Sequence, residues 1–211
     1  MSILKRLLSQ CKRPGGSFGR LIARGMNFAH SPLTKWALGH IEVTANAAAL
    51  DVGCGGGRTV DRLAKMAVDG RVVGLDYSKD SVTVSRLRNS DHIRSGRVEI
   101  CHASVSDIPY PDNTFDLVTA VETFYFWPAP ETDLLEVRRV LQPVGQLVIA
   151  CTMYKGGKHD KRNQKFVDEI NMTYLGEDEF QRLLGDSGFD NIDVVVEYEK
   201  GWICATARTA V

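Results

Sequence analysis

Short apolar runs alternate with amphipathic segments along most of the chain. The runs have the length of buried strands, and the segments between them place apolar residues at helical spacing. The pattern predicts strands at 47–50, 71–76, from 98, 115–121, 145–151, 191–196 and 202–207, with helices at 59–67, 79–89, 131–141 and 177–184. Strands that alternate with helices are typical of a parallel, doubly wound α/β sheet.

The carboxyl-terminal part departs from this alternation. No helix separates the last two expected strands, which meet at Lys200-Gly201, so we expect them to pair as an antiparallel hairpin. Residues 153–174, after the fifth expected strand, are polar and rich in Lys, Asn and Gly. This segment is interpreted either as a solvated, mobile loop or as a lid over the site that favours an anionic acceptor.

The first 41 residues carry several basic residues and no acidic one, and the first acidic residue is Glu42. The apolar side chains of 3–11 fall on one helical face, and further helical blocks are expected at 18–28 and 33–41. The basic helix has three interpretations: packing on the domain with its charges in water, which we favour, contact with a membrane surface, or organelle targeting.

Composition narrows the class of protein. The 211 residues fit one α/β domain, and the equal numbers of basic and acidic residues, 26 each, do not indicate a nucleic-acid partner. No apolar run approaches the roughly 20 residues of a membrane-spanning helix. The five cysteines are scattered without a C-x-x-C pair, and the histidines lack metal-ligand spacing. We therefore expect a cytoplasmic protein with reduced thiols and no metal site.

A glycine-rich turn follows the first expected strand and precedes a helix. Asp51 closes the strand, glycines stand at 53, 55, 56 and 57, and Arg58 follows them. Glycines allow positive φ and close approach of a ligand to the backbone, and a helix start offers unpaired N–H groups. A dinucleotide fingerprint would place its third glycine where Arg58 stands, so the turn departs from that fingerprint. Cys54 is interpreted as a small residue of a tight turn rather than a nucleophile.

The pattern D-x-G-x-G-x-G that begins at Asp51 resembles the first motif of the class I S-adenosylmethionine-dependent methyltransferases. Asp76 ends the next apolar strand roughly 20 residues later, where such folds place a carboxylate on ribose hydroxyls. The following Tyr77-Ser78 resembles the family's D-x-S continuation, in which the residue after the acid packs on adenine. The alternative for Asp76 is a helix N-cap, but Ser78 is better placed to cap the helix at 79–89.

Residues 98–118 provide the longest match. They resemble the family's stretch G-D-A-x-x-L-P-F-x-D-x-S-F-D-L-V, with Ser104 where many members have an Asp that accepts from the adenine amino group. The resemblance therefore places Ser104 and the backbone N–H of Val105 at adenine. Serine is the weaker acceptor because it carries no charge.

The chain resembles small, single-domain members of methyltransferase type 11, specifically over about residues 45–150. The resemblance implies a seven-stranded, mostly parallel sheet in residues 45–211, an N-terminal helical cap in 1–44, S-adenosyl-L-methionine as cofactor and S-adenosyl-L-homocysteine as product. It also implies a set of cofactor-binding residues, namely Asp51, Gly53, Gly55, Asp76, Tyr77, Ser104, Val105 and Glu122.

Four consecutive aromatic residues follow the fourth expected strand, at the carboxyl edge of the sheet where ligands of such folds bind. Tyr125, Phe126 and Trp127 either line the acceptor pocket or pack the next helix and the cap. The sequence assigns no catalytic residue, and the candidates for a general base are His30, Glu122 and Tyr125.

The sequence thus predicts an enzyme that transfers a methyl group from S-adenosylmethionine to a small-molecule acceptor by in-line displacement. Because the sulfonium is already an activated leaving group, the enzyme supplies mainly proximity and alignment. There are two alternatives. One is a nicotinamide-dependent oxidoreductase, which Arg58 and the block at 98–118 oppose, and the other is a catalytically silent module that binds adenosylmethionine.

Overall fold

The computed structural model describes residues 31–170 and 172–210. Within them, seven strands form one sheet in the order β3-β2-β1-β4-β5-β7-β6. The first five strands are parallel, and β7 runs antiparallel to both of its neighbours. The strands are β1 (Ala48–Val52), β2 (Arg71–Asp76), β3 (Val98–His102), β4 (Phe115–Val121), β5 (Leu141–Cys151), β6 (Phe189–Glu197) and β7 (Trp202–Thr209). The mostly parallel sheet and its antiparallel final pair confirm the predicted fold class.

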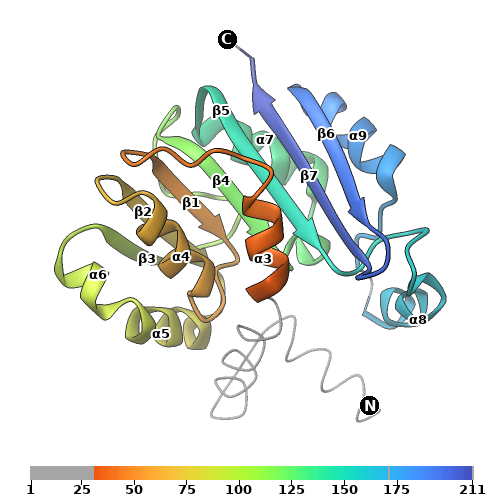
Figure 1. The fold of residues 1–211 in the computed structure, drawn as a ribbon, viewed down its shortest axis with the longest axis horizontal. Coiled ribbons are helices and arrows are strands. Elements are labelled where there is room, and N and C mark those ends of the chain that lie inside the picture. Colours follow the sequence, from red (N-terminus) through yellow and green to blue (C-terminus); the bar gives the residue numbers. More distant parts are fainter. Residues whose placement is uncertain (1–30, 171, 211) are drawn as a thin grey trace.

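Helices cover both faces of this sheet, with α3, α4 and α5 on one face and α7 and α9 on the other (Figure 1). They are α3 (Ser31–Leu38), α4 (Arg58–Met66), α5 (Lys79–Arg88), α6 (Ser90–Arg94), the short 3₁₀ helix η1 (Phe124–Phe126), α7 (Pro130–Val140), α8 (Asp160–Ile170) and α9 (Glu177–Asp186).

The two faces bury two hydrophobic clusters. Leu33 of α3 and Leu63 of α4 join one cluster with Val148, whereas Leu134 of α7 and Leu184 of α9 join the other with the next residue, Ile149. Successive side chains of a strand point to opposite faces, so the continuous apolar run of β5 serves both clusters. This double burial explains why the central strands read as unbroken apolar runs in the sequence.

The fifth strand begins earlier than the sequence predicted. Strand β5 starts at Leu141 rather than at residue 145, because Leu141 pairs with Phe115 directly after α7 ends. The pairing register then shifts before Leu117 meets Gln146, and Val144 in this irregular stretch has a φ of 56°. Pro143 thus lies in an irregular part of the strand, where a missing backbone N–H is tolerated.

The interpretation of residues 153–174 as a loop is wrong, since helix α8 occupies its centre. The helix is difficult to recognise in the sequence because charged residues occupy most of it, while Val167 and Ile170 pack against the core. The segment is closed at its neck by a hydrogen bond from the Lys155 backbone N–H to the Leu175 carbonyl, 2.9 Å long. It is therefore a short helical excursion from the carboxyl end of β5, at the lower right in Figure 1.

The N-terminal predictions are only partly covered. The expected helix at 33–41 is observed as α3, which packs on the sheet beside β5. The basic helix, the block at 18–28 and His30 lie outside the described residues, so the helical cap of 1–44 stays a prediction. In the described part of the chain, no helix is both long and apolar enough to cross a membrane.

Candidate functional site

The glycine loop lies across the carboxyl end of the sheet between β1 and β2. The backbone N–H groups of Gly53 and Cys54 both donate to the Leu75 carbonyl, at 2.7 and 2.9 Å. Gly53 has a φ of 71°, and a Cβ added to it would lie 2.1 Å from the Thr123 side-chain oxygen. Glycine is therefore required at 53 both by conformation and by the close approach of the segment after β4.

Asp76 joins this loop to the end of β2. Its buried carboxylate accepts hydrogen bonds from the backbone N–H groups of Gly55, at 2.9 Å, and of Ser78, at 2.8 Å. Burial raises the pKa of Asp76, and these hydrogen bonds partly oppose the increase. Ser78 caps α5 by accepting from the Ser81 N–H, as the sequence predicted. Asp76 is thus a carboxylate at the cavity rather than the cap of α5.

Asp51 lies behind the loop and is almost fully buried. The Thr119 hydroxyl donates to its carboxylate at 2.7 Å, yet burial raises the pKa of Asp51 to about 7. Burial and the two aspartates also raise the pKa of the Cys54 thiol well above its usual range. A thiol kept neutral in this way is a poor nucleophile, which supports the packing role predicted for Cys54.

A cavity of about 200 Å³ opens beside the glycine loop. It brings together seven of the predicted site residues from four parts of the chain, Gly53, Asp76, Tyr77, Ser104, Val105, Phe126 and Trp127. Its other lining residues were not predicted from the sequence, and they are Val52, Leu75, Ala103, Thr123 and Pro128. Of these, Thr123 has no sequence signal, because its proximity to Gly53 depends on the neighbouring strands β1 and β4.

The adenine candidates lie at one side of the cavity, just after β3. The Ser104 hydroxyl accepts a hydrogen bond from the Ser106 backbone N–H at 3.2 Å, and the Val105 side chain is buried. Tyr77, which also lines the cavity, remains 39 % exposed. Tyr77 and Val105 therefore give the cavity apolar side chains, and Ser104 adds a hydroxyl.

The remaining predicted residues do not line the cavity. Asp51 lies behind the loop and accepts from the Thr119 hydroxyl, and Gly55, within the loop, donates its backbone N–H to Asp76. The Glu122 carboxylate accepts from the Tyr125 hydroxyl at 2.9 Å, so these two candidates for a general base are bonded to each other. His30 lies outside the described residues.

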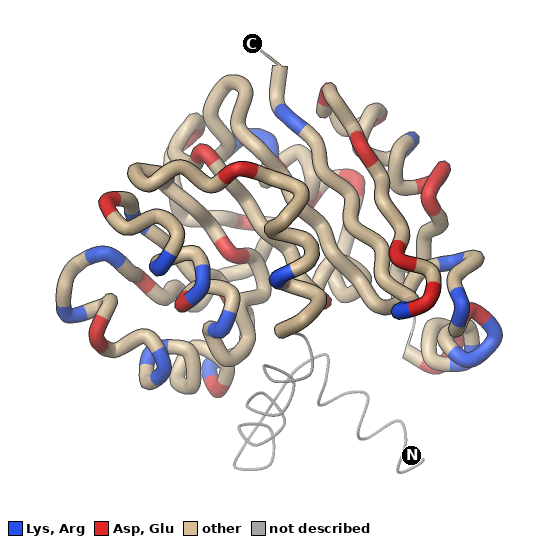
Figure 2. Tube along the Cα trace, in the orientation of Figure 1, with Lys and Arg blue, Asp and Glu red and all other residues tan. Residues whose placement is uncertain are grey.

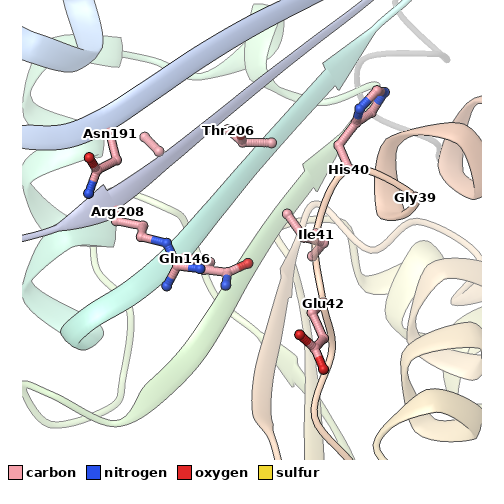
Figure 3. Close-up of a pocket in the computed structure, with 9 residues that line it drawn as sticks. Gly39, His40, Ile41, Glu42, Gln146, Asn191, Thr206 and Arg208 are labelled. Atoms are coloured by element: carbon pink, nitrogen blue, oxygen red, sulfur yellow. The ribbon is translucent and has the colours of Figure 1, made fainter.

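A second cavity, of about 290 Å³, lies against the amino-terminal half of β5 and beside β7. Figure 3 shows Gln146 and Arg208 next to each other on its floor, with His40 and Glu42 on the opposite wall. The Arg208 guanidinium donates to the Val144 carbonyl at 3.0 Å. This cavity shares no residue with the first one, and its arginine is engaged by the protein itself. Within 31–170 and 172–210, no cluster of side chains could hold a metal ion.

A known protein family matches the part of the chain that contains this site. Residues 50–149 match the family described as "Methyltransferase domain". The chain is 32 % identical to the O-methyltransferase cnsE of Penicillium expansum, over 69 % of this chain and 52 % of that protein. It is 36 % identical to a demethylmenaquinone methyltransferase of Bacillus licheniformis, over 51 % of this chain and 46 % of that protein. The chain thus spans about half the length of these curated relatives.

A solved structure agrees over a larger part of the fold. The crystal structure of a SAM-dependent methyltransferase from Aquifex aeolicus superposes with a TM-score of 0.73, covering 90 % of this chain and 98 % of that one at 23 % identity. At this identity the likeness concerns the fold alone. The family match includes the glycine loop and Asp76, and together with the relatives it confirms the predicted family: the chain belongs to the class I S-adenosylmethionine-dependent methyltransferases.

Proposed function

We propose that this domain binds S-adenosylmethionine in the 200 Å³ cavity and transfers its methyl group to a small-molecule acceptor. S-adenosylmethionine is the cofactor that the family and the fold imply, as the sequence predicted. The observation that carries the proposal is the convergence of the glycine loop, the Asp76 carboxylate and the Ser104-Val105 segment on one cavity. This donor set fits an adenosyl group, which presents a ribose diol, an apolar ring face and polar ring edges.

Each wall of the cavity has a distinct role in this proposal. Asp76 accepts hydrogen bonds from the two ribose hydroxyls, and charge makes those bonds strong. Tyr77 and Val105 hold the adenine ring, while Ser104 and the Val105 N–H meet its polar edge. The bare backbone at Gly53, which lines the cavity, lets the amino-acid end of the cofactor approach the loop without meeting a Cβ, while Gly55 fixes the loop through its hydrogen bond to Asp76.

The bound cofactor supplies an activated methyl group, so the protein has mainly to align the acceptor. Phe126 and Trp127 line the cavity at the end where β4 leads into η1, and they form the wall that we assign to the acceptor. Glu122 and Tyr125 are hydrogen-bonded to each other, so neither is well placed to act as a general base. The geometry therefore favours acceptors that lose their proton readily or after methylation.

A small-molecule acceptor agrees with the names of the relatives, an O-methyltransferase and a demethylmenaquinone methyltransferase. Basic and acidic residues are interspersed along the described helices, as Figure 2 shows for α4, α5 and α8. This mixing agrees with the equal numbers of basic and acidic residues in the chain, which do not indicate a nucleic-acid partner. The alternative of a nicotinamide-dependent oxidoreductase conflicts with the family to which the chain belongs.

Calorimetry with S-adenosylhomocysteine tests the cofactor site. Asp76→Asn should weaken its binding about 30-fold, because the charged hydrogen bonds to the ribose contribute about 2 kcal/mol. Asp193→Asn, which changes an exposed aspartate on β6, is the matched control and should leave binding unchanged. Equal dissociation constants for Asp76→Asn and the unaltered protein would show that Asp76 does not bind the ribose.

Turnover distinguishes an enzyme from a silent binder. Release of S-adenosylhomocysteine should be measured with a panel of hydroxyl, thiol and amine acceptors of small size. Production with at least one class supports the proposal. Tight binding of S-adenosylhomocysteine without turnover on any of them would favour the silent module.

A further inference from the structure

Glu122 has an unusual position for a charged residue. It follows directly after β4 and has a φ of 59°, a backbone conformation that residues other than glycine seldom adopt. Only 7 % of the residue is exposed. Such a conformation costs on the order of 1–3 kcal/mol and persists only where its surroundings enforce it. A strained and buried carboxylate beside a ligand cavity points to a role beyond packing.

The surroundings of Glu122 are three elements at the carboxyl edge of the sheet. Its carboxylate accepts hydrogen bonds from the Thr152 hydroxyl and the Tyr125 hydroxyl, each at 2.9 Å, and also from the Thr152 backbone N–H. Its own backbone N–H donates to the Ala150 carbonyl at 2.8 Å. Glu122 therefore joins the end of β4 to the end of β5 and to η1, with each carboxylate oxygen engaged.

The same cluster holds both ends of the segment 152–175, which contains α8. Thr152 stands where this segment leaves β5, and the Thr173 backbone N–H donates to the Tyr125 carbonyl at 3.1 Å where it returns. Tyr125 and Glu122 are buried, whereas Thr152 and Thr173 are half-buried, so both connections are partly shielded from water. In contrast, the ion pairs of Lys155 with Glu179 and of Lys158 with Glu199 are exposed and contribute little.

The cluster also touches the proposed cofactor site. Thr123, the residue after Glu122, packs so closely on Gly53 that no Cβ would fit between them. Phe126, at the end of η1, and the next residue, Trp127, both line the cavity. A ligand in the cavity therefore presses on the same turn that carries Glu122 and Tyr125.

We propose that Glu122 is a positioning residue that couples the cofactor cavity to the segment 152–175. Occupation of the cavity stabilises the turn 122–127. Because Glu122 and Tyr125 are hydrogen-bonded to both ends of the segment, those ends are stabilised as well. The segment then completes the acceptor side of the site. This inference rests on the proposed cofactor site and adds to it a reason for the strained carboxylate.

Hydrogen exchange with S-adenosylhomocysteine as the probe tests the coupling. In the unaltered protein, saturation with this ligand should slow exchange of the backbone amides of 152–175 about tenfold, which corresponds to about 1.4 kcal/mol. Tyr125→Phe and Thr152→Val each remove one hydroxyl that donates to Glu122. In both variants the ligand-induced slowing should fall to about twofold or less, while the dissociation constant stays within about threefold.

The control is another tyrosine hydroxyl paired with a glutamate. Tyr110→Phe removes the interaction of Tyr110 with Glu99 on β3, away from the segment, and should leave the tenfold slowing intact. Glu122→Gln keeps an acceptor for the Thr152 N–H and should retain part of the coupling, whereas Glu122→Met should abolish it. The hydroxyl variants decide the question should Glu122→Met fail to fold.

The possible outcomes distinguish a failure of the proposed function from a failure of the coupling alone. No binding of S-adenosylhomocysteine by the unaltered protein would overturn the proposed function and the coupling together. Binding with undiminished slowing in Tyr125→Phe and Thr152→Val would overturn the coupling alone, because the segment would then respond without the Glu122 cluster. Binding without any slowing in the unaltered protein would also overturn it.

Discussion

At the scale of single residues, the sheet edge at the proposed cofactor site depends on positions that only particular residue types can occupy. Gly53 has a positive φ and faces Thr123, while Glu122 has a positive φ without being glycine. The first was predictable from the glycine motif. The second was not, because its conformation is imposed by hydrogen bonds to residues about 30 positions further along the chain.

Gly53→Ala should destabilise the protein by at least about 2 kcal/mol, because it adds a steric clash to the backbone strain. Gly96→Ala is the matched control. Gly96 has a similar φ of 76°, but an added Cβ would meet no atom within 4 Å, so the loss should be about 1 kcal/mol. Urea unfolding of both variants measures the difference. Equal losses would show that Thr123 yields to the methyl group and that the contact is not tight.

At the scale of elements, α7 holds the loop that follows the adenine candidates. The Arg139 guanidinium donates to the carbonyls of Ile108 and Tyr110 and to the carboxylates of Asp112 and Glu136, at 2.7–3.0 Å. Glu136 in turn accepts from the Ile108 backbone N–H at 2.8 Å. The planar fork of arginine satisfies this geometry, which a lysine ammonium cannot reproduce.

Arg139→Lys is therefore expected to destabilise the protein by about 1–2 kcal/mol despite the retained charge. Arg138→Lys, one position earlier on the same helix, should change the free energy of unfolding by less than about 0.5 kcal/mol. Chemical denaturation of the two variants provides the comparison. A loss no greater at 139 than at 138 would mean that charge alone holds the loop.

The helices and strands also show how much of the secondary structure the apolar periodicity predicts. The strands and the helices α4, α5, α7 and α9 lie where the apolar pattern places them, within a few residues at their ends. Helix α8 was missed because its apolar positions are few, and the early start of β5 was missed because a proline falls within it. In both cases the deciding interaction comes from another part of the chain, as the pairing of Leu141 with Phe115 illustrates.

At the scale of the whole molecule, the buried Asp51 links stability to pH. Burial raises its pKa to about 7, whereas the unfolded chain releases the proton at about pH 4. The folded state therefore holds an additional proton between these values, and the free energy of unfolding falls as the pH rises through this window. The contribution of Asp51 is at most about 4 kcal/mol.

Asp51→Asn should remove this dependence, because the amide stays neutral and its oxygen can still accept from Thr119. Relative to the unaltered protein, the variant should become progressively more stable from pH 4 to pH 7. Thermal unfolding across this range measures the difference. Parallel stability curves for the two proteins would show that Asp51 titrates near its ordinary pKa when folded.

The sequence by itself determined the family, the layered α/β architecture and most of the residues that line the proposed cofactor cavity. These features are local: apolar runs set the strands, and the glycine turn, Asp76 and the 98–118 block each stand at the end of one strand. Only the tertiary structure placed Thr123 against Gly53, and Glu122 against Thr152 and Tyr125. Two of these contacts join segments 30 to 70 positions apart, and no local pattern encodes them because neighbouring strands β1, β4 and β5 meet only after the sheet has formed.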